Sequence, residues 1–287
     1  MLNVIYYPVS AILWLWHQVF ALVLGDGSAI GWASSIVLLV FTVRALLLGP
    51  AIAQLRSTAH MRAIAPRVAA IRKRYPGNRP RQMAEIAALQ RDHGVSSLGG
   101  CLPALLQVPV FIGLNHVLRA FAQHPHQPNY LFPLSEVHSY LDATLFGAHL
   151  GDAIVNIGLI GGWVAGHATW AWGVAPVAIP LMIVAAVATH VTARLSAGRG
   201  GDTAGAGSPL VRRLSMWVFP LGVLVFGAVL PVGLLIYWVS NNIWTLGQQR
   251  FVAARVVSRG RPPGRGSVPA RRAPAPKPGQ KPVRRKG

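Results

Sequence analysis

One cation inside a long apolar run constrains this chain more than any other feature. Residues 30–53 read IGWASSIVLLVFTVRALLLGPAIA, and Arg44 is the single charged residue among them. As a helix, the run is long enough to cross about 30 Å of hydrocarbon. A cation at the centre of a membrane helix costs about 2.5–3.5 kcal/mol on insertion scales, so it normally faces a protein interior or a water-filled cavity. We therefore expect Arg44 to belong to a functional site. The alternative is a snorkelling or carbonyl-capping residue that holds helices together.

The charge balance places the chain among polytopic membrane proteins. Of its 287 residues, 53% are hydrophobic, yet 27 Lys and Arg face only 7 Asp and Glu. Soluble domains do not combine long apolar runs with a net charge of +20. No Lys or Arg occurs in residues 1–43 or 121–193, whereas basic residues gather in 56–91, 194–213 and 250–286. The positive-inside rule then predicts a multi-pass protein with its N-terminus outside and its C-terminus in the cytoplasm.

Hydropathy and loop charge together predict an all-α polytopic membrane protein with five transmembrane helices. The predicted spans are 29–53, 98–121, 174–195 and a pair within 214–251. The segments between them are a cytoplasmic helical hairpin at 54–97, an external loop at 122–173 and a cytoplasmic loop at 196–213. Residues 252–287 form a basic tail, rich in Pro and Gly toward its end, that should be disordered.

The first 28 residues are apolar but differ from a simple span. Residues 4–24 contain Pro8, Trp14, Trp16 and His17, an aromatic-rich pattern suited to the membrane interface. We predict that 1–28 form an amphipathic helix lying on the outer surface. A sixth span is the alternative, but it would place an uncharged N-terminus in the cytoplasm and invert every later loop.

Signals of enzyme chemistry or metal binding are absent from the sequence. Cys101 is the single cysteine, which excludes an internal disulfide and a multi-cysteine metal site. The histidines expected outside match no familiar metal spacing, and no GxSxG, HExxH or P-loop motif is present. We therefore expect no enzyme activity, no metal and no cofactor.

Several segments resemble one family closely. Residues 99–121, GGCLPALLQVPVFIGLNHVLRAF, resemble the second core span of the YidC membrane protein insertase family, part of the YidC/Oxa/Alb superfamily, in which Gly-Gly-Cys is followed by Gln-x-Pro-x-Phe. FTVRALLLGP around Arg44 is similar to the first core span, residues 61–100 to the cytoplasmic hairpin, and residues 218–249 to the last two spans. The Trp-rich first helix and the enlarged external loop look most like actinobacterial members.

The resemblance implies a function and a site. Members of the family insert and fold newly made membrane proteins, alone or beside the Sec translocon, through a hydrophilic groove open to the cytoplasm and to lipid, without a cofactor. Arg44 matches the groove arginine, and Tyr237 and Trp238 match a Tyr-Trp pair of the last span. Gln107 is a further groove candidate, because it lies on a span broken by prolines. The third span offers no clear match among Thr189, His190 and Thr192.

Two basic regions suggest partners. Hairpin residues that could receive the nascent chain or bind anionic lipid are Met61, Arg62, Arg72, Lys73 and Arg74, although a solvated positive-inside face is an equal alternative. Tail residues that could contact the ribosome or anionic lipid are Arg271, Arg272, Arg284, Arg285 and Lys286. A monomer would suffice mechanically.

Two other functions compete with insertion. The first is an anion-binding transporter or channel that uses Arg44, which internal inverted repeats would favour; the sequence contains no such repeat. The second is an assembly factor that grips partner helices without inserting them.

Overall fold

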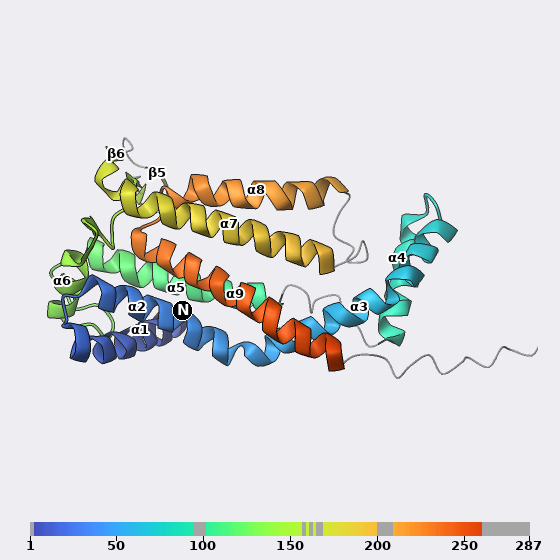
Figure 1. Ribbon diagram of the computed structural model, residues 1–287, viewed down its shortest axis with the longest axis horizontal. Coiled ribbons are helices and arrows are strands. Elements are labelled where there is room, and N and C mark those ends of the chain that lie inside the picture. Colours follow the sequence, from blue (N-terminus) through green and yellow to red (C-terminus); the bar gives the residue numbers. More distant parts are fainter. Residues whose placement is uncertain are drawn as a thin grey trace, which may run out of the picture.

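Helices running along one long axis make up most of this protein (Figure 1). The computed structural model describes residues 3–93, 102–156, 159–160, 163–164, 169–199 and 209–259. Its helices are α1 (Asn3–Leu24), α2 (Ala29–Leu46), α3 (Leu48–Arg74), α4 (Arg79–Asp92), α5 (Leu102–Gln123), α6 (Leu134–Asp142), α7 (Ala175–Arg199), α8 (Pro209–Gly227) and α9 (Val232–Arg259). The prediction of a mainly helical protein is confirmed.

The region between α6 and α7 adds short antiparallel ladders. Its two-residue strands are β1 (Thr144–Leu145), β2 (Ala148–His149), β3 (Val155–Asn156), β4 (Leu159–Ile160), β5 (Trp163–Val164) and β6 (Thr169–Trp170). β1 pairs with β2, β3 with β6 and β4 with β5. A 3₁₀ turn, η2 (Trp172–Val174), then leads into α7.

The bundle has two unlike ends. α7 packs against α8 and α9, α9 also packs against α2, and α1 packs against α2 and α5. At one end lie α6 and the short strands, and at the other α3 and α4 project beyond the bundle (Figure 1). We call these the α6 end and the α4 end.

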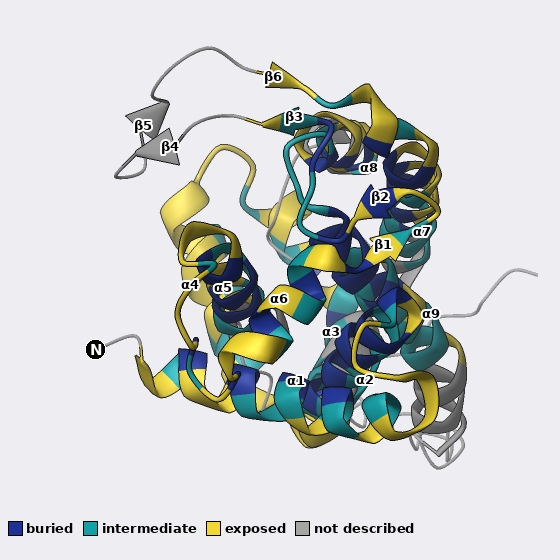
Figure 2. Cartoon of the chain, turned by 90° about the vertical axis from the view of Figure 1, so that its left-hand side faces the viewer, coloured by how far each residue is buried: buried dark blue, intermediate teal, exposed yellow. Residues whose placement is uncertain are grey.

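A buried aromatic cluster closes the α6 end. Trp32 on α2 is fully buried, and its ring lies 5.2 Å from that of Tyr140 on α6. Its Nε1 also donates to Ser139 Oγ at 3.0 Å. Phe121 and Phe132 complete the cluster, with ring centroids 5.0 Å apart. Figure 2 shows buried residues gathered inside this end and exposed residues on its outer surface. The segment after α5 is therefore a packed cap.

α1 packs closely against its neighbours. Its buried residues include Leu13 and His17, and the His17 ring stacks on Trp32 at 3.7 Å. Gly113 on α5 permits a close approach, because a Cβ there would lie 3.0 Å from Cγ2 of Val9. α1 is also long and apolar enough to cross a membrane. Its placement on the outer surface stays a prediction.

Three segments in the described part of the chain have the length and hydropathy of a membrane span. They are α1, α2 and residues Trp172–Leu195, while α8 carries a shorter apolar stretch, Met216–Gly227. α9 is interrupted by polar residues such as Asn241 and Asn242, which lower its mean hydropathy. The chain is thus an apolar helical protein with candidate membrane spans, and the count of five spans stays a prediction.

The first predicted span and the hairpin have different boundaries from those expected. α2 ends at Leu46, and α3 begins at Leu48, inside the segment 29–53 that we assigned to the span. Pro50 lacks the N–H that would bond the carbonyl of residue 46, which explains the break. Helical geometry resumes at once, since Ala51 N donates to Leu47 O at 3.1 Å. The span and the first hairpin arm are therefore nearly continuous.

A short turn joins α3 to α4 within the predicted hairpin segment, and α9 extends into the segment predicted as a tail. Gly77 has a positive φ of +77°, and Asn78 caps α4 by accepting from Arg81 N at 3.1 Å. α9 continues to Arg259, so residues 252–259 are helical and not part of a disordered tail. Residues 248–259 contain no Gly or Pro, which explains the extension. The rest of the tail lies outside the described residues.

Glu136 on α6 gives the cap a testable pH dependence. Partial burial raises the pKa of the Glu136 carboxyl, and nearby Asp26 adds to this, while a hydrogen bond from Gln18 opposes it. A raised folded-state pKa means that the folded protein binds the proton more tightly than the unfolded chain. The contribution of Glu136 to the free energy of unfolding is therefore fully present below the ordinary pKa of glutamate. It is lost as the pH rises through the higher pKa of the folded state. We expect Glu136→Gln to flatten the decrease in melting temperature between about pH 4 and 7 in detergent. The exposed Asp142→Asn on the same helix is the control, and an equal flattening there would contradict the prediction.

Candidate functional site

The Arg44 guanidinium is held by two neutral side chains of α9. Arg44 lies in the last turn of α2 and is half-buried. Its Nε donates to Asn241 Oδ1 at 3.0 Å, and its Nη2 donates to the same oxygen at 2.6 Å. Nη2 also donates to Thr245 Oγ1 at 3.2 Å. One amide oxygen and one hydroxyl therefore fix the side of the guanidinium that faces α9.

The local geometry of α9 explains why these partners converge. Asn241 and Thr245 are four residues apart, so they occupy one face of the helix. Thr245 Oγ1 donates to Asn241 O at 2.8 Å, which leaves the hydroxyl oxygen available to accept from Arg44. Packing of α2 against α9 brings the cation to this face.

The partners of Arg44 leave its charge uncompensated. Within the described residues, the hydrogen bonds of Arg44 go to Asn241 and Thr245, and no carboxylate pairs with it. Its Nη1 has no hydrogen-bond partner in this part of the chain. A carboxylate in place of the amide would neutralise the cation, whereas an amide orients it and keeps the positive field. The site therefore presents a fixed cation with donors to spare.

Two other predicted groove residues meet one turn along α9. Gln107 on α5 donates through Nε2 to the hydroxyl of Tyr237. Tyr237 is buried, and its ring lies 5.6 Å from that of Phe111. Tyr237, Asn241 and Thr245 follow at intervals of four, so they share a face. Arg44, from α2, and Gln107, from α5, thus contact the same face of α9. We call Arg44, Gln107, Tyr237, Asn241 and Thr245 the polar stripe.

Trp238 does not join the polar stripe. It packs on a small cluster formed by Ala185, Ala186 and Val223, from α7 and α8. Its ring also lies nearly perpendicular to that of Phe111, with centroids 6.2 Å apart. As the next residue after Tyr237, it points about 100° around the helix, which explains the separation.

The polar residues of α7 also lie apart from Arg44. Thr189 Oγ1 donates to Asn242 Oδ1 at 3.4 Å, and Asn242 Nδ2 donates to Trp238 O at 3.0 Å. His190 contacts Met216 O through Nδ1 at 3.0 Å. These contacts join α7, α8 and α9 to one another.

Sequence reasoning missed part of this site. Neither Asn241 nor Thr245 was among the groove residues that the sequence predicted. The available signal was the four-residue spacing of two hydrogen-bonding side chains in a predicted span. Nothing in that spacing says which of the two adjacent asparagines faces Arg44.

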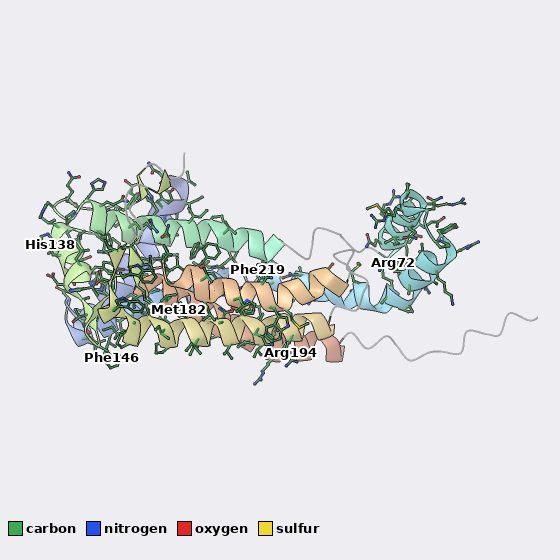
Figure 3. All side chains as sticks on the ribbon, turned by 90° about the horizontal axis from the view of Figure 1, so that it is seen from above. Arg72, His138, Phe146, Met182, Arg194 and Phe219 are labelled. Atoms are coloured by element: carbon green, nitrogen blue, oxygen red, sulfur yellow. The ribbon has the colours of Figure 1, made fainter. Side chains whose placement is uncertain are left out.

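The predicted recruitment residues lie at the α4 end. Arg72, Lys73 and Arg74 are exposed, and Figure 3 shows Arg72 at the opposite end from His138. Met61 is half-buried and accepts from Gln90 Nε2 through its sulfur at 3.7 Å. The side chain of Arg62 and the tail residues Arg271, Arg272, Arg284, Arg285 and Lys286 lie outside the described part of the chain.

Comparison with known proteins gives consistent matches. Residues 23–259 match the family described as the 60Kd inner membrane protein. A membrane protein insertase YidC of Mycobacterium tuberculosis (strain H37Rv) is 40% identical over 299 aligned positions, covering 99% of this chain and 81% of the relative. The corresponding protein of Mycobacterium leprae is 38% identical, covering 98% and 77%. One from Streptomyces avermitilis is 30% identical, covering 85% and 56%. The resemblance to actinobacterial members is thereby confirmed.

The contact between Arg44 and Asn241 predicts a measurable coupling. In a double-mutant cycle with Arg44→Met and Asn241→Ala, we expect a coupling of about 0.6–1.7 kcal/mol in the free energy of unfolding in micelles, the range of polar pairs within membranes. Asn242→Ala is the matched control, because its amide contacts Thr189 and Trp238 instead. A coupling of Arg44 to Asn242 as large as that to Asn241 would contradict this geometry.

Proposed function

We infer the function from one premise, that the chain belongs to the YidC family of membrane protein insertases, which carries the 60Kd inner membrane protein domain. The protein inserts newly made membrane proteins into the membrane. We propose further that it does so through a hydrophilic groove lined by Arg44, Gln107 and Tyr237. The groove would open to the cytoplasm and to lipid.

The observation that carries the proposal is the uncompensated charge of Arg44. Asn241 and Thr245 hold the guanidinium through neutral oxygens, so its field stays available to an incoming chain. Two unit charges 4 Å apart attract by about 4 kcal/mol at an effective dielectric constant of 20. An acidic residue at the leading end of a substrate would therefore be drawn into the groove.

The driving force for release would be hydrophobic. A polar segment that rests in the groove crosses a shorter distance in hydrocarbon than it would through the intact bilayer. The apolar span of the substrate then moves into lipid, gaining roughly 25 cal/mol per Å² of apolar surface removed from water. The proposed mechanism needs no catalytic residue, nucleotide or cofactor.

The orientation that we propose follows the charge distribution. The exposed bases of α3 and α4 would face the cytoplasm, and the α6 end, which belongs to a segment without Lys or Arg, would face outside. This orientation agrees with a chain that crosses the plasma membrane five times, with its N-terminus outside and its C-terminus in the cytoplasm. The protein would act as a monomer, alone or beside the Sec translocon.

The proposed partners at the cytoplasmic face follow from the same charges. Exposed Arg72, Lys73 and Arg74 would receive nascent chains or bind anionic lipid headgroups. The basic tail would contact the ribosome or the same lipids. Membership of the insertase family favours this scheme over the anion-binding transporter considered from the sequence.

Reconstitution tests the role of Arg44 directly. Purified full-length protein in proteoliposomes should protect from protease the translocated end of a single-span substrate that carries acidic residues there. We expect Arg44→Ala to reduce protection about fivefold or more, because loss of one or two kcal/mol of attraction corresponds to roughly a 5- to 30-fold change. A substrate with Asn and Gln in place of its acids should lose much less.

Arg119→Ala is the matched control for that experiment. Arg119 is half-buried on α5, where its Nε donates to Asn115 Oδ1 at 3.0 Å, away from the polar stripe. We expect this variant to insert both substrates at the wild-type level. Equal loss of both substrates in Arg44→Ala would mean that Arg44 acts by holding helices together. Failure of wild type would exclude insertion by this protein alone, and added translocon would then test the joint pathway.

A further inference from the structure

Large aromatic side chains lie exposed beside the start of α7. Phe146, at the turn between β1 and β2, is 90% exposed. Trp170 and Trp172 are 59% and 65% exposed, and their rings stack in parallel with centroids 5.4 Å apart. Exposed tryptophan and phenylalanine are uncommon on surfaces that meet only water.

The backbone at Phe146 makes its exposure harder to explain by the local fold. Phe146 has a φ of +48°, and Gly147 follows with +85°. In two-residue hairpin turns such positions favour Asn or Gly, since a Cβ is strained there. A phenylalanine therefore fits this turn poorly, and its nearly complete exposure leaves little packing within the protein to offset the strain. An external contact would supply a reason for the residue.

The position of this turn matches the level at which α7 begins. β2 contacts η2, the 3₁₀ turn that carries Trp172 and leads into α7. The candidate membrane span likewise begins at Trp172. Figure 3 shows Phe146 at the outer edge of the α6 end. The aromatic residues thus lie where the span would meet an interface.

An exposed apolar stripe continues from this point along α7. Ile179, Ile183 and Val187 are 42%, 51% and 57% exposed and follow at intervals of four, so they share a face. Such a face on a candidate span is suited to lipid tails. Trp residues characteristically mark the ends of such faces, at the level of the headgroups.

The charges near these aromatic residues indicate whether a membrane contact would be electrostatic or apolar. No Lys or Arg occurs from 121 to 193, and the exposed charged residues close to the turn are acidic, such as Asp142. Attraction to anionic headgroups therefore cannot drive this contact. The driving force for this membrane contact would therefore be the insertion of the apolar aromatic rings into the bilayer.

We propose that Phe146, together with Trp170 and Trp172, forms a membrane anchor in the leaflet at the α6 end, with the tip of the β1–β2 hairpin inserted among the lipid headgroups and upper acyl chains. The occupant of this surface is the bilayer itself, and the anchor holds the cap at a fixed depth beside α7. It is independent of the proposed groove and of insertion.

An environment-sensitive probe tests the depth of the hairpin. A fluorescent nitrobenzoxadiazole label is attached at Phe146→Cys in a Cys101→Ser background, with one full-length protein per lipid nanodisc. We expect a blue-shifted emission that is quenched at least about twofold more by lipids labelled near the headgroup than by lipids labelled deep in the acyl chain. Zwitterionic and anionic nanodiscs should give the same result. The label at Ser135→Cys, an exposed site on α6, is the control and should report water.

A second variant separates anchoring from folding. Phe146→Asn suits the positive φ, so we expect an unchanged or higher melting temperature in detergent. With the label at Thr144→Cys, the same substitution should reduce quenching by headgroup-labelled lipid. Water-like emission at position 146, or quenching at 144 that Phe146→Asn leaves unchanged, would overturn the proposal. Blue-shifted emission without lipid quenching would also overturn it, because the side chain would then contact protein.

Discussion

The contact between Arg44 and α9 is the interaction on which the rest of this account depends. A guanidinium near the end of an apolar helix requires acceptors, and the protein supplies the oxygens of Asn241 and Thr245. These neutral acceptors satisfy the donors that face α9 and keep the cation charged. Because the same contact joins α2 to α9, one set of hydrogen bonds both orients the cation and helps to hold two helices of the bundle together.

The two ends of the bundle are built for different environments. At the α6 end, Trp32, Phe121 and Tyr140 form a buried aromatic core beneath the cap. At the α4 end, α3 and α4 carry exposed bases and few buried residues. A chain that approached from the charged end would meet the polar stripe first and the closed cap last. This asymmetry fits a site that accepts polar segments from one side and passes apolar spans sideways into lipid.

The helical architecture could be predicted from the sequence, and Arg44 could be singled out as a candidate site residue, because both inferences follow from strong local rules. An arginine in an apolar run stands out by its insertion cost. Tyr237 followed from the family resemblance, and Gln107 followed from its place on a span broken by prolines. The resemblance pairs Trp238 with Tyr237, but adjacent helical residues point to different sides, and Trp238 packs against α7 and α8 while Tyr237 contacts Gln107. Thr245 was missed because its four-residue spacing from Asn241 places the two on one face of α9 but does not say that this face meets Arg44. The break at Leu47 and the extension to Arg259 depend on single residues, Pro50 and Gly260, that are easily outweighed in a pattern of hydropathy.

The most direct test is to detect a substrate at the polar stripe during insertion. A photo-crosslinking amino acid is introduced at Thr245, beside Arg44, and ribosome-bound chains of a small single-span membrane protein are stalled at successive lengths. The account predicts crosslinks from Thr245 at the lengths at which the leading polar segment has left the ribosome, and their loss when the span is released into lipid. Crosslinks from exposed α3 positions such as Lys73, with none from Thr245 at any length, would contradict it, because the substrate would then bypass the cation.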